Sequence, residues 1–91
     1  MRIYLDNAST TPIDPRVLKE MVFHLKNTTG NAGSIHEEGV KAKKVLDESR
    51  KKAAGFLGAH SDEIVFTSGG TESNNLAIIG SLSPSFEVRE R

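Results

Sequence analysis

Apolar side chains in the first third of the sequence recur at the spacing of an α-helix. Val17, Met21 and Leu25 are spaced four residues apart, and Leu18 and Val22 widen this apolar stripe. Asp14 precedes Pro15, which is the order of a helix N-cap and a first helical residue, because proline lacks an N–H that would go unused there. The pattern predicts a helix over residues 15–27.

A second helix is predicted after the turn-forming Gly-Asn-Ala-Gly sequence at residues 30–33. Ser34 and Glu37 are three residues apart, the spacing of a capping box, and Gly58 is a plausible end of the helix. The apolar stripe between them contains Val40, Val45, Leu46, Ala53, Phe56 and Leu57.

The remaining pattern predicts an arm, a strand, a glycine turn and a third helix. Residues 3–5 form a short apolar run that we interpret as a short strand or an extended arm, followed by a loop. Residues 63–67 have the composition and length of a strand. Ser-Gly-Gly-Thr-Glu at residues 68–72 then leads into a helical run that continues to Gly80.

The glycine turn is the strongest candidate for a ligand site. Gly69 and Gly70 allow a sharp turn and a close approach of the backbone to a ligand, and they precede the free N–H groups of a helix. A helix N-terminus attracts anions, and the Thr71 hydroxyl suits a phosphate monoester. An ordinary tight turn capped by Thr71 or Ser68 explains the pattern equally well. The P-loop lysine and the G-x-G-x-x-G spacing are both absent.

Composition excludes several classes of function. The 91 residues carry twelve basic and twelve acidic side chains, so no electrostatic footprint for nucleic acid is present. The chain has no cysteine, and its three histidines match no compact zinc motif, so we expect no metal site. Without a signal peptide or a run of about 18 apolar residues, the expected location is cytoplasmic, with no membrane partner.

His36 lies at the predicted start of the second helix, where the helix dipole disfavours an imidazolium. A neutral ring that faces a ligand and a histidine that caps a surface turn are both compatible with this position. His24 and His60 are interpreted as surface residues.

Four stretches, in order, resemble the cysteine desulfurases of the class V aminotransferase superfamily. They are Tyr-Leu-Asp-Asn-Ala-Ser-Thr-Thr-Pro at 4–12, Gly-Asn-Ala-Gly-Ser-Ile-His at 30–36, Leu-Gly-Ala at 57–59, and the strand and turn region at 63–78. The last stretch is the most specific. Ser9 and Ala32 depart from the family, which usually has alanine and proline there. The resemblance covers residues 3–80.

The resemblance implies an α/β fold, namely the amino-terminal portion of a fold-type I transferase that depends on pyridoxal 5'-phosphate. Within an incomplete domain of residues 1–91, it implies an arm and loop over 1–14, a helix-helix-strand-helix region over 15–80, and a linker or tail over 81–91. Gly70 and Thr71 match the family pair that holds the cofactor phosphate. Asn31 and His36 match the loop on the substrate side of the pocket.

The activity implied by the resemblance is the conversion of L-cysteine to L-alanine, with sulfur passed to an enzyme persulfide and then to an acceptor protein for iron–sulfur cluster or thio-cofactor synthesis. Members are usually homodimers. The reactive lysine, the aspartate on the pyridine nitrogen, the stacked histidine and the sulfur-carrying cysteine of the family lie downstream of this segment. We therefore assign no catalytic residue here and expect the segment alone to be inactive.

Two alternatives remain open at this point. A selenocysteine lyase, or another class V lyase, would share this opening sequence. A non-catalytic dimerisation or binding module left by truncation would retain the same scaffold without the chemistry.

Overall fold

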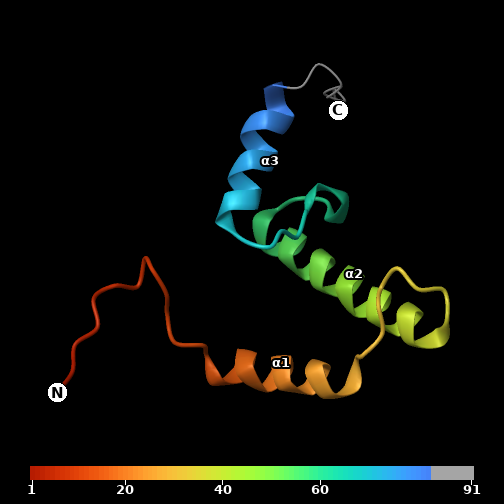
Figure 1. The fold of residues 1–91 in the computed structure, drawn as a ribbon, viewed down its shortest axis with the longest axis horizontal. Coiled ribbons are helices and arrows are strands. Elements are labelled where there is room, and N and C mark those ends of the chain that lie inside the picture. Colours follow the sequence, from red (N-terminus) through yellow and green to blue (C-terminus); the bar gives the residue numbers. More distant parts are fainter. Residues whose placement is uncertain (83–91) are drawn as a thin grey trace. The chain divides into compact units, whose positions relative to one another are not determined.

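The computed structural model describes residues 1–82, which form three α-helices and one short 3-10 helix (Figure 1). The elements are α1 (Pro15–Asn27), α2 (Glu37–Leu57), η1 (Ser61–Glu63) and α3 (Gly70–Leu82). The chain divides within α2 into two compact parts, residues 1–49 and residues 50–91.

Helix α1 has the predicted bounds, Pro15–Asn27. The Asp14 carboxylate accepts a hydrogen bond from the Arg16 amide at 2.8 Å, and it also pairs with the Arg16 guanidinium through both oxygens. This satisfies one of the N–H groups that have no partner inside the helix. At the other end the Thr28 amide donates to the His24 carbonyl at 2.8 Å. The predicted N-cap is therefore confirmed.

Helix α2 begins later than the predicted capping box requires. A box with Ser34 as the N-cap would start the helix at Ile35, whereas α2 starts at Glu37. The His36 carbonyl accepts the first helical hydrogen bond, from the Val40 amide at 3.0 Å. The capping box was wrong because the Ser34 amide instead donates to the Asn31 carbonyl at 2.9 Å, which closes a turn before the helix.

Gly58 ends α2, as predicted. Its φ of 64° lies in the left-handed region, which glycine occupies without a Cβ penalty. The following amide, that of Ala59, donates to the Ala54 carbonyl at 2.9 Å. A left-handed residue just after the last turn, with this bond back into the helix, is a common helix termination.

The strand predicted over residues 63–67 is not formed within the part of the chain that the structure describes. Glu63 closes η1, and its amide donates to the His60 carbonyl at 3.0 Å. Ile64 is extended, with φ −95° and ψ 122°, but residues 64–67 pair with no neighbouring strand among residues 1–82. Extended backbone becomes a strand only when a neighbouring strand accepts and donates the ladder hydrogen bonds. The α/β character that the sequence predicts is thus not formed within these residues.

The third predicted helix is confirmed as α3, which continues through Ser81 and Leu82, two residues beyond its expected end. The rest of the predicted linker or tail, residues 83–91, lies outside the described residues.

Residues 3–5 form no strand among the described residues, so the arm is the interpretation that holds. The Tyr4 hydroxyl lies 3.1 Å from the carbonyl oxygens of both Asp6 and Thr10. The Ser9 amide donates to the Asp6 carbonyl at 3.0 Å. The arm therefore bends through one turn whose contacts are all local.

Among residues 1–82, Ala54 is the one buried hydrophobic residue, with 3% of its surface exposed. Large apolar side chains are exposed on every α-helix, for example Leu25 at 76%, Phe56 at 93% and Ile79 at 64%. Burial therefore contributes little to this conformation, and caps, turns and helical hydrogen bonds hold most of it.

A pair of glycine substitutions in and after α2 tests this view of its termination. Gly58→Ala should reduce helix stability by about 1 kcal/mol, because alanine is strained at a positive φ. Gly55→Ala should increase it by up to about 1 kcal/mol, because Gly55 is helical and a Cβ there meets nothing within 4 Å. Far-ultraviolet circular dichroism of the 91-residue polypeptide measures both. Equal effects of the two substitutions would contradict the assigned helix end.

Candidate functional site

The N-terminus of α3 presents a group of unused backbone donors. The amides of Gly70, Thr71 and Glu72 stand in the first turn, before the first α-helical hydrogen bond, in which the Ser73 amide donates to the Gly69 carbonyl at 3.1 Å. No acceptor among the described residues takes a hydrogen bond from these three amides. The Thr71 hydroxyl is likewise without a partner among residues 1–82. Four donors thus stand at the positive end of a helix dipole.

Glu72 folds its side chain back over the preceding residue. One carboxylate oxygen accepts hydrogen bonds from the Ser68 hydroxyl at 2.5 Å and from the Ser68 amide at 3.2 Å. The Ser68 hydroxyl, and then the Ser68 amide, lower the pKa of Glu72 below its ordinary value. The carboxylate therefore stays charged near the helix N-terminus, where it is hydrogen-bonded to Ser68.

The two glycines of the turn are not required by the chain's own geometry. Neither Gly69 nor Gly70 has a positive φ, so the sharp turn expected from the sequence does not depend on glycine here. A Cβ built on either residue meets no atom of residues 1–82 within 4 Å. The space beside both glycines is open to a ligand.

The loop before α2 is held by two close backbone contacts. A Cβ on Gly30 would overlap the Glu38 carbonyl group, and a Cβ on Gly39 would overlap the Ser34 carbonyl group. Gly39 is itself buried. The glycines at both positions therefore let the loop lie directly against the first turn of α2.

Asn31 and His36 share this loop, and each makes a local hydrogen bond. The Asn31 side-chain oxygen accepts from the Gly33 amide at 2.8 Å. The His36 Nδ1 atom accepts from the Gly39 amide at 3.4 Å, so His36 caps α2 while its ring remains exposed. A ring whose Nδ1 accepts this bond carries any ring proton on Nε2 when it is neutral. The cap that the sequence left as one alternative is the contact present.

The four predicted site residues therefore form two local pairs. Gly70 and Thr71 are consecutive in α3, within the part of the chain that begins at residue 50. Asn31 and His36 belong to the loop in residues 1–49.

Three further residues support the α3 turn and were not singled out from the sequence. The Thr67 hydroxyl donates to the Gly69 carbonyl at 3.2 Å and lies 2.6 Å from the Ser73 hydroxyl oxygen. Arg50 donates from Nε to the Ile64 carbonyl at 3.2 Å. Arg50 offered a signal, because it occupies the apolar stripe of α2, four residues after Leu46. A charged residue on an otherwise apolar stripe needs a polar or aromatic partner if that stripe is to pack against other residues.

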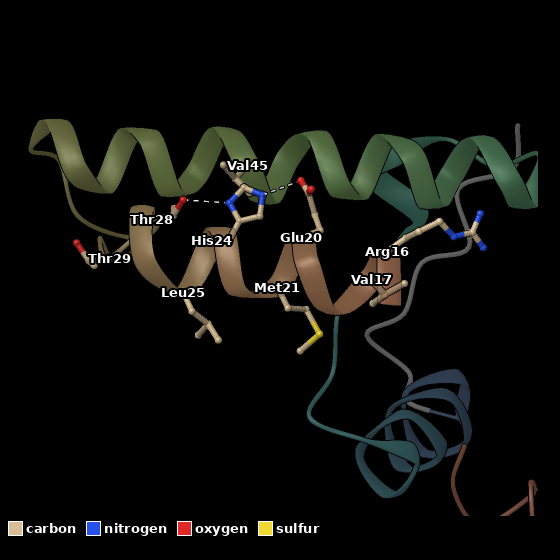
Figure 2. A pocket seen from close by; sticks show the side chains of 9 residues that line it. All are labelled: Arg16, Val17, Glu20, Met21, His24, Leu25, Thr28, Thr29 and Val45. Atoms are coloured by element: carbon tan, nitrogen blue, oxygen red, sulfur yellow. Dashed lines mark hydrogen bonds and ion pairs between the residues drawn. The ribbon is translucent and has the colours of Figure 1, made fainter. Parts of the chain in front are cut away.

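A shallow groove runs along α1, and none of the predicted site residues lines it. Figure 2 shows His24 between Glu20 and Thr28 on the side of α1 that faces Val45, with Nε2 3.3 Å from the Glu20 carboxylate and Nδ1 3.0 Å from the Thr28 hydroxyl. The groove is lined by Arg16, Val17, Glu20, Met21, His24, Leu25, Thr28, Thr29 and Val45. His24 is thus half-buried and engaged, rather than the plain surface residue expected from the sequence.

Residues 1–82 contain no group of three or more histidine, cysteine or acidic side chains arranged to hold a metal ion. None of the helices in this described range is long and apolar enough to cross a membrane.

The Glu72 contact predicts a measurable change in acidity. Ser68→Ala should raise the pKa of Glu72 towards its ordinary value, because the Ser68 hydroxyl is the main cause of the lowering. Since the folded-state pKa is depressed, this contact stabilises the turn above the unfolded pKa of Glu72 and is lost as the pH falls through the lower folded value. A carboxyl NMR titration of Glu72 measures the shift, and an unchanged midpoint in the variant would contradict the contact.

Comparison with known proteins places this chain in a family. The aminotransferase class-V model matches residues 3–90. The chain is 51% identical over 78 residues to the cysteine desulfurase IscS of Dictyoglomus turgidum, covering 86% of this chain and 20% of that protein. It is 48% identical over 82 residues to the mitosomal cysteine desulfurase of Trachipleistophora hominis, covering 89% of this chain and 19% of that protein.

The Archaeoglobus fulgidus protein named cysteine desulfurase IscS 1 is 47% identical over 77 residues, which cover 85% of this chain and 20% of that protein. The chain thus spans about a fifth of the length of the curated relatives it matches. No solved structure matches it. Because the family model covers nearly the whole sequence, the chain belongs to the aminotransferase class-V family, and it is similar to the amino-terminal part of the family's cysteine desulfurases.

Proposed function

We propose that residues 1–91 are the amino-terminal portion of a fold-type I, pyridoxal-phosphate-dependent cysteine desulfurase. The support is the match of residues 3–90 to the class V model and the identity of about half the residues to proteins named cysteine desulfurase. In this proposal the whole enzyme converts L-cysteine to L-alanine and passes sulfur, through a persulfide, to an acceptor protein for iron–sulfur clusters or thio-cofactors. The cytoplasm stays the expected compartment.

In the same proposal, the N-terminus of α3 binds the cofactor phosphate. Gly70 contributes its amide, and Thr71 contributes its amide and hydroxyl. A phosphate dianion needs several donors and a favourable field, and the unused amides at the positive end of a helix supply both. When bound, the cofactor supplies an electron sink for carbanion chemistry. The residues described here would anchor it but would not react.

The observation that carries the phosphate assignment is the pair of glycines without an internal role. Gly69 and Gly70 have neither a positive φ nor a neighbour that a Cβ would strike. A backbone kept free of side chains beside unused amides is suited to a ligand that approaches closely. The Glu72 carboxylate is hydrogen-bonded to the Ser68 amide and hydroxyl and not to the amides of residues 70–72.

Asn31 and His36 are proposed to lie on the substrate side of the pocket in the whole protein. The support is the position of both residues in one loop that Gly30 and Gly39 hold against α2. The His36 cap uses Nδ1 and leaves Nε2 available. A ring fixed through one nitrogen can present the other in a defined direction.

The 91-residue polypeptide alone is proposed to be inactive. It has no cysteine to carry sulfur, and no lysine in it lies in the family's cofactor-lysine motif. The whole enzyme is proposed to act as a homodimer. Broad exposure of apolar side chains on α1, α2 and α3 supports the need for further protein surface around this segment.

Replacement of Thr71 tests the phosphate site. In the whole protein, Thr71→Val should weaken binding of pyridoxal phosphate about tenfold or more, because a hydrogen bond to a charged group contributes about 1.5–3 kcal/mol. Thr71→Ser keeps the hydroxyl and should bind close to the unaltered protein. Titration of the apo-protein followed by cofactor absorbance measures both. Unchanged affinity of the valine variant would count against the site.

The activity is tested by product analysis. With pyridoxal phosphate, the whole protein should release sulfide and L-alanine from L-cysteine, whereas the 91-residue polypeptide should release neither. A strong preference for L-selenocysteine would favour the selenocysteine lyase alternative. No turnover of either amino acid by the cofactor-loaded whole protein would favour a non-catalytic module.

A further inference from the structure

Arg50 of α2 makes a two-point contact with the segment that precedes the glycine turn. Its Nε atom donates to the Ile64 carbonyl at 3.2 Å. Its guanidinium carbon lies 5.3 Å from the centre of the Phe66 ring, within the range of a cation–π interaction. Residues 64–67 have no strand partner among residues 1–82. The guanidinium therefore links α2 to this segment at two points.

The same segment is fastened at its other end to α3. The Thr67 hydroxyl donates to the Gly69 carbonyl at 3.2 Å and lies 2.6 Å from the Ser73 hydroxyl oxygen. Gly69 and Ser73 flank the unused amides of residues 70–72. A continuous series of contacts thus runs from Arg50, through Ile64 and the Thr67 hydroxyl, to both sides of the anion-binding amides.

We propose that Arg50 is a positioning residue for the phosphate-binding turn, an inference that rests on the proposed function. A single contact would let the extended segment rotate about it. Arg50 instead holds a carbonyl oxygen and, two residues later, the face of a ring, so the direction in which the chain enters Gly69 is fixed. The donors at the start of α3 are then oriented before the phosphate arrives, which favours binding of the phosphate specifically.

The planar guanidinium suits this task better than an ammonium. It can donate in its plane to Ile64 while its face lies over Phe66, because its charge is delocalised over a flat group. A lysine at this position offers one point charge, which can satisfy the carbonyl or the ring but not both in the same geometry. Replacement of Arg50 by lysine should therefore weaken phosphate binding less than replacement by an uncharged side chain does.

A purely structural role predicts a different outcome from a positioning role. If Arg50 only stabilises the fold, its loss should weaken binding of pyridoxal phosphate and of pyridoxal, which lacks the phosphate, by the same factor. If Arg50 orients the phosphate donors, its loss should weaken binding of the phosphorylated compound alone. The ratio of the two dissociation constants separates these cases.

The experiment measures that ratio in the whole apo-protein by absorbance titration. Arg50→Met keeps the length of the side chain and removes its charge and donors, so binding of pyridoxal phosphate should weaken about tenfold while binding of pyridoxal changes little. Arg50→Lys should bind pyridoxal phosphate with an affinity between those of the unaltered protein and of Arg50→Met. Lys51→Met, which removes a positive charge from an exposed neighbour on α2, is the matched control and should leave the ratio unchanged.

Phe66→Leu gives a second test that leaves Arg50 in place. It removes the aromatic face and should weaken binding of pyridoxal phosphate, relative to binding of pyridoxal, by about threefold. The effect is smaller than that of Arg50→Met because a cation–π contact is weaker than a charged hydrogen bond. If Arg50→Met does not fold, this variant decides. Wild-type ratios in the variants that fold, or equal losses for both ligands, would overturn the proposal.

Thr71→Val in the same titration keeps the two proposals distinguishable. Loss of phosphate affinity in Thr71→Val together with a normal ratio in Arg50→Met and Phe66→Leu would reject the positioning role and leave the phosphate site intact. A normal ratio in all three variants would reject the phosphate site itself, and with it the inference built on Arg50.

Discussion

The constraint on which the described structure depends is the need to satisfy backbone hydrogen bonds almost without a buried core. Only Ala54 is a buried hydrophobic residue within residues 1–82. Where burial is so limited, the ends of each helix depend on nearby groups, because the free N–H and C=O groups there have no partner in the helix. Asp14 supplies such a group to α1, His36 to α2, and Gly58 allows the turn that ends α2.

Glycine has three distinct roles in this chain. Gly58 accepts a positive φ, and Gly30 and Gly39 permit close packing of the loop on α2. Gly69 and Gly70 need neither, and they border the unused donors of α3. The first two roles are explained within the chain, whereas the third would be explained by the phosphate site proposed above. Gly55 and Gly80 also have open space beside them, so the proposed phosphate site depends on the glycine pair together with the unused donors of α3.

The Arg50 contact links a scaffold helix to the candidate site. Its hydrogen bond to Ile64 and its contact with the Phe66 ring hold the extended segment in place. In a sheet, neighbouring strands would hold it through ladder hydrogen bonds. A hydrogen bond from a cation to a backbone carbonyl holds one point only, so the ring contact is needed to fix the direction. An arginine on an apolar stripe is therefore a useful signal in related sequences, although periodicity by itself assigns it no partner.

The sequence by itself determined the bounds of α1, the end of α2, the presence of α3 and the family, because caps, left-handed glycines and helical spacing act between near neighbours. It placed Gly70 and Thr71 at a helix N-terminus for the same reason. The cap of α2 by His36 and not Ser34 is a competition between near neighbours, because the Ser34 amide donates to Asn31 and the Gly39 amide donates to His36. Only the tertiary structure decided that residues 64–67 stay unpaired and that Arg50 holds them. Those two outcomes depend on groups far apart in the sequence, and spacing along the chain does not encode which of them meet.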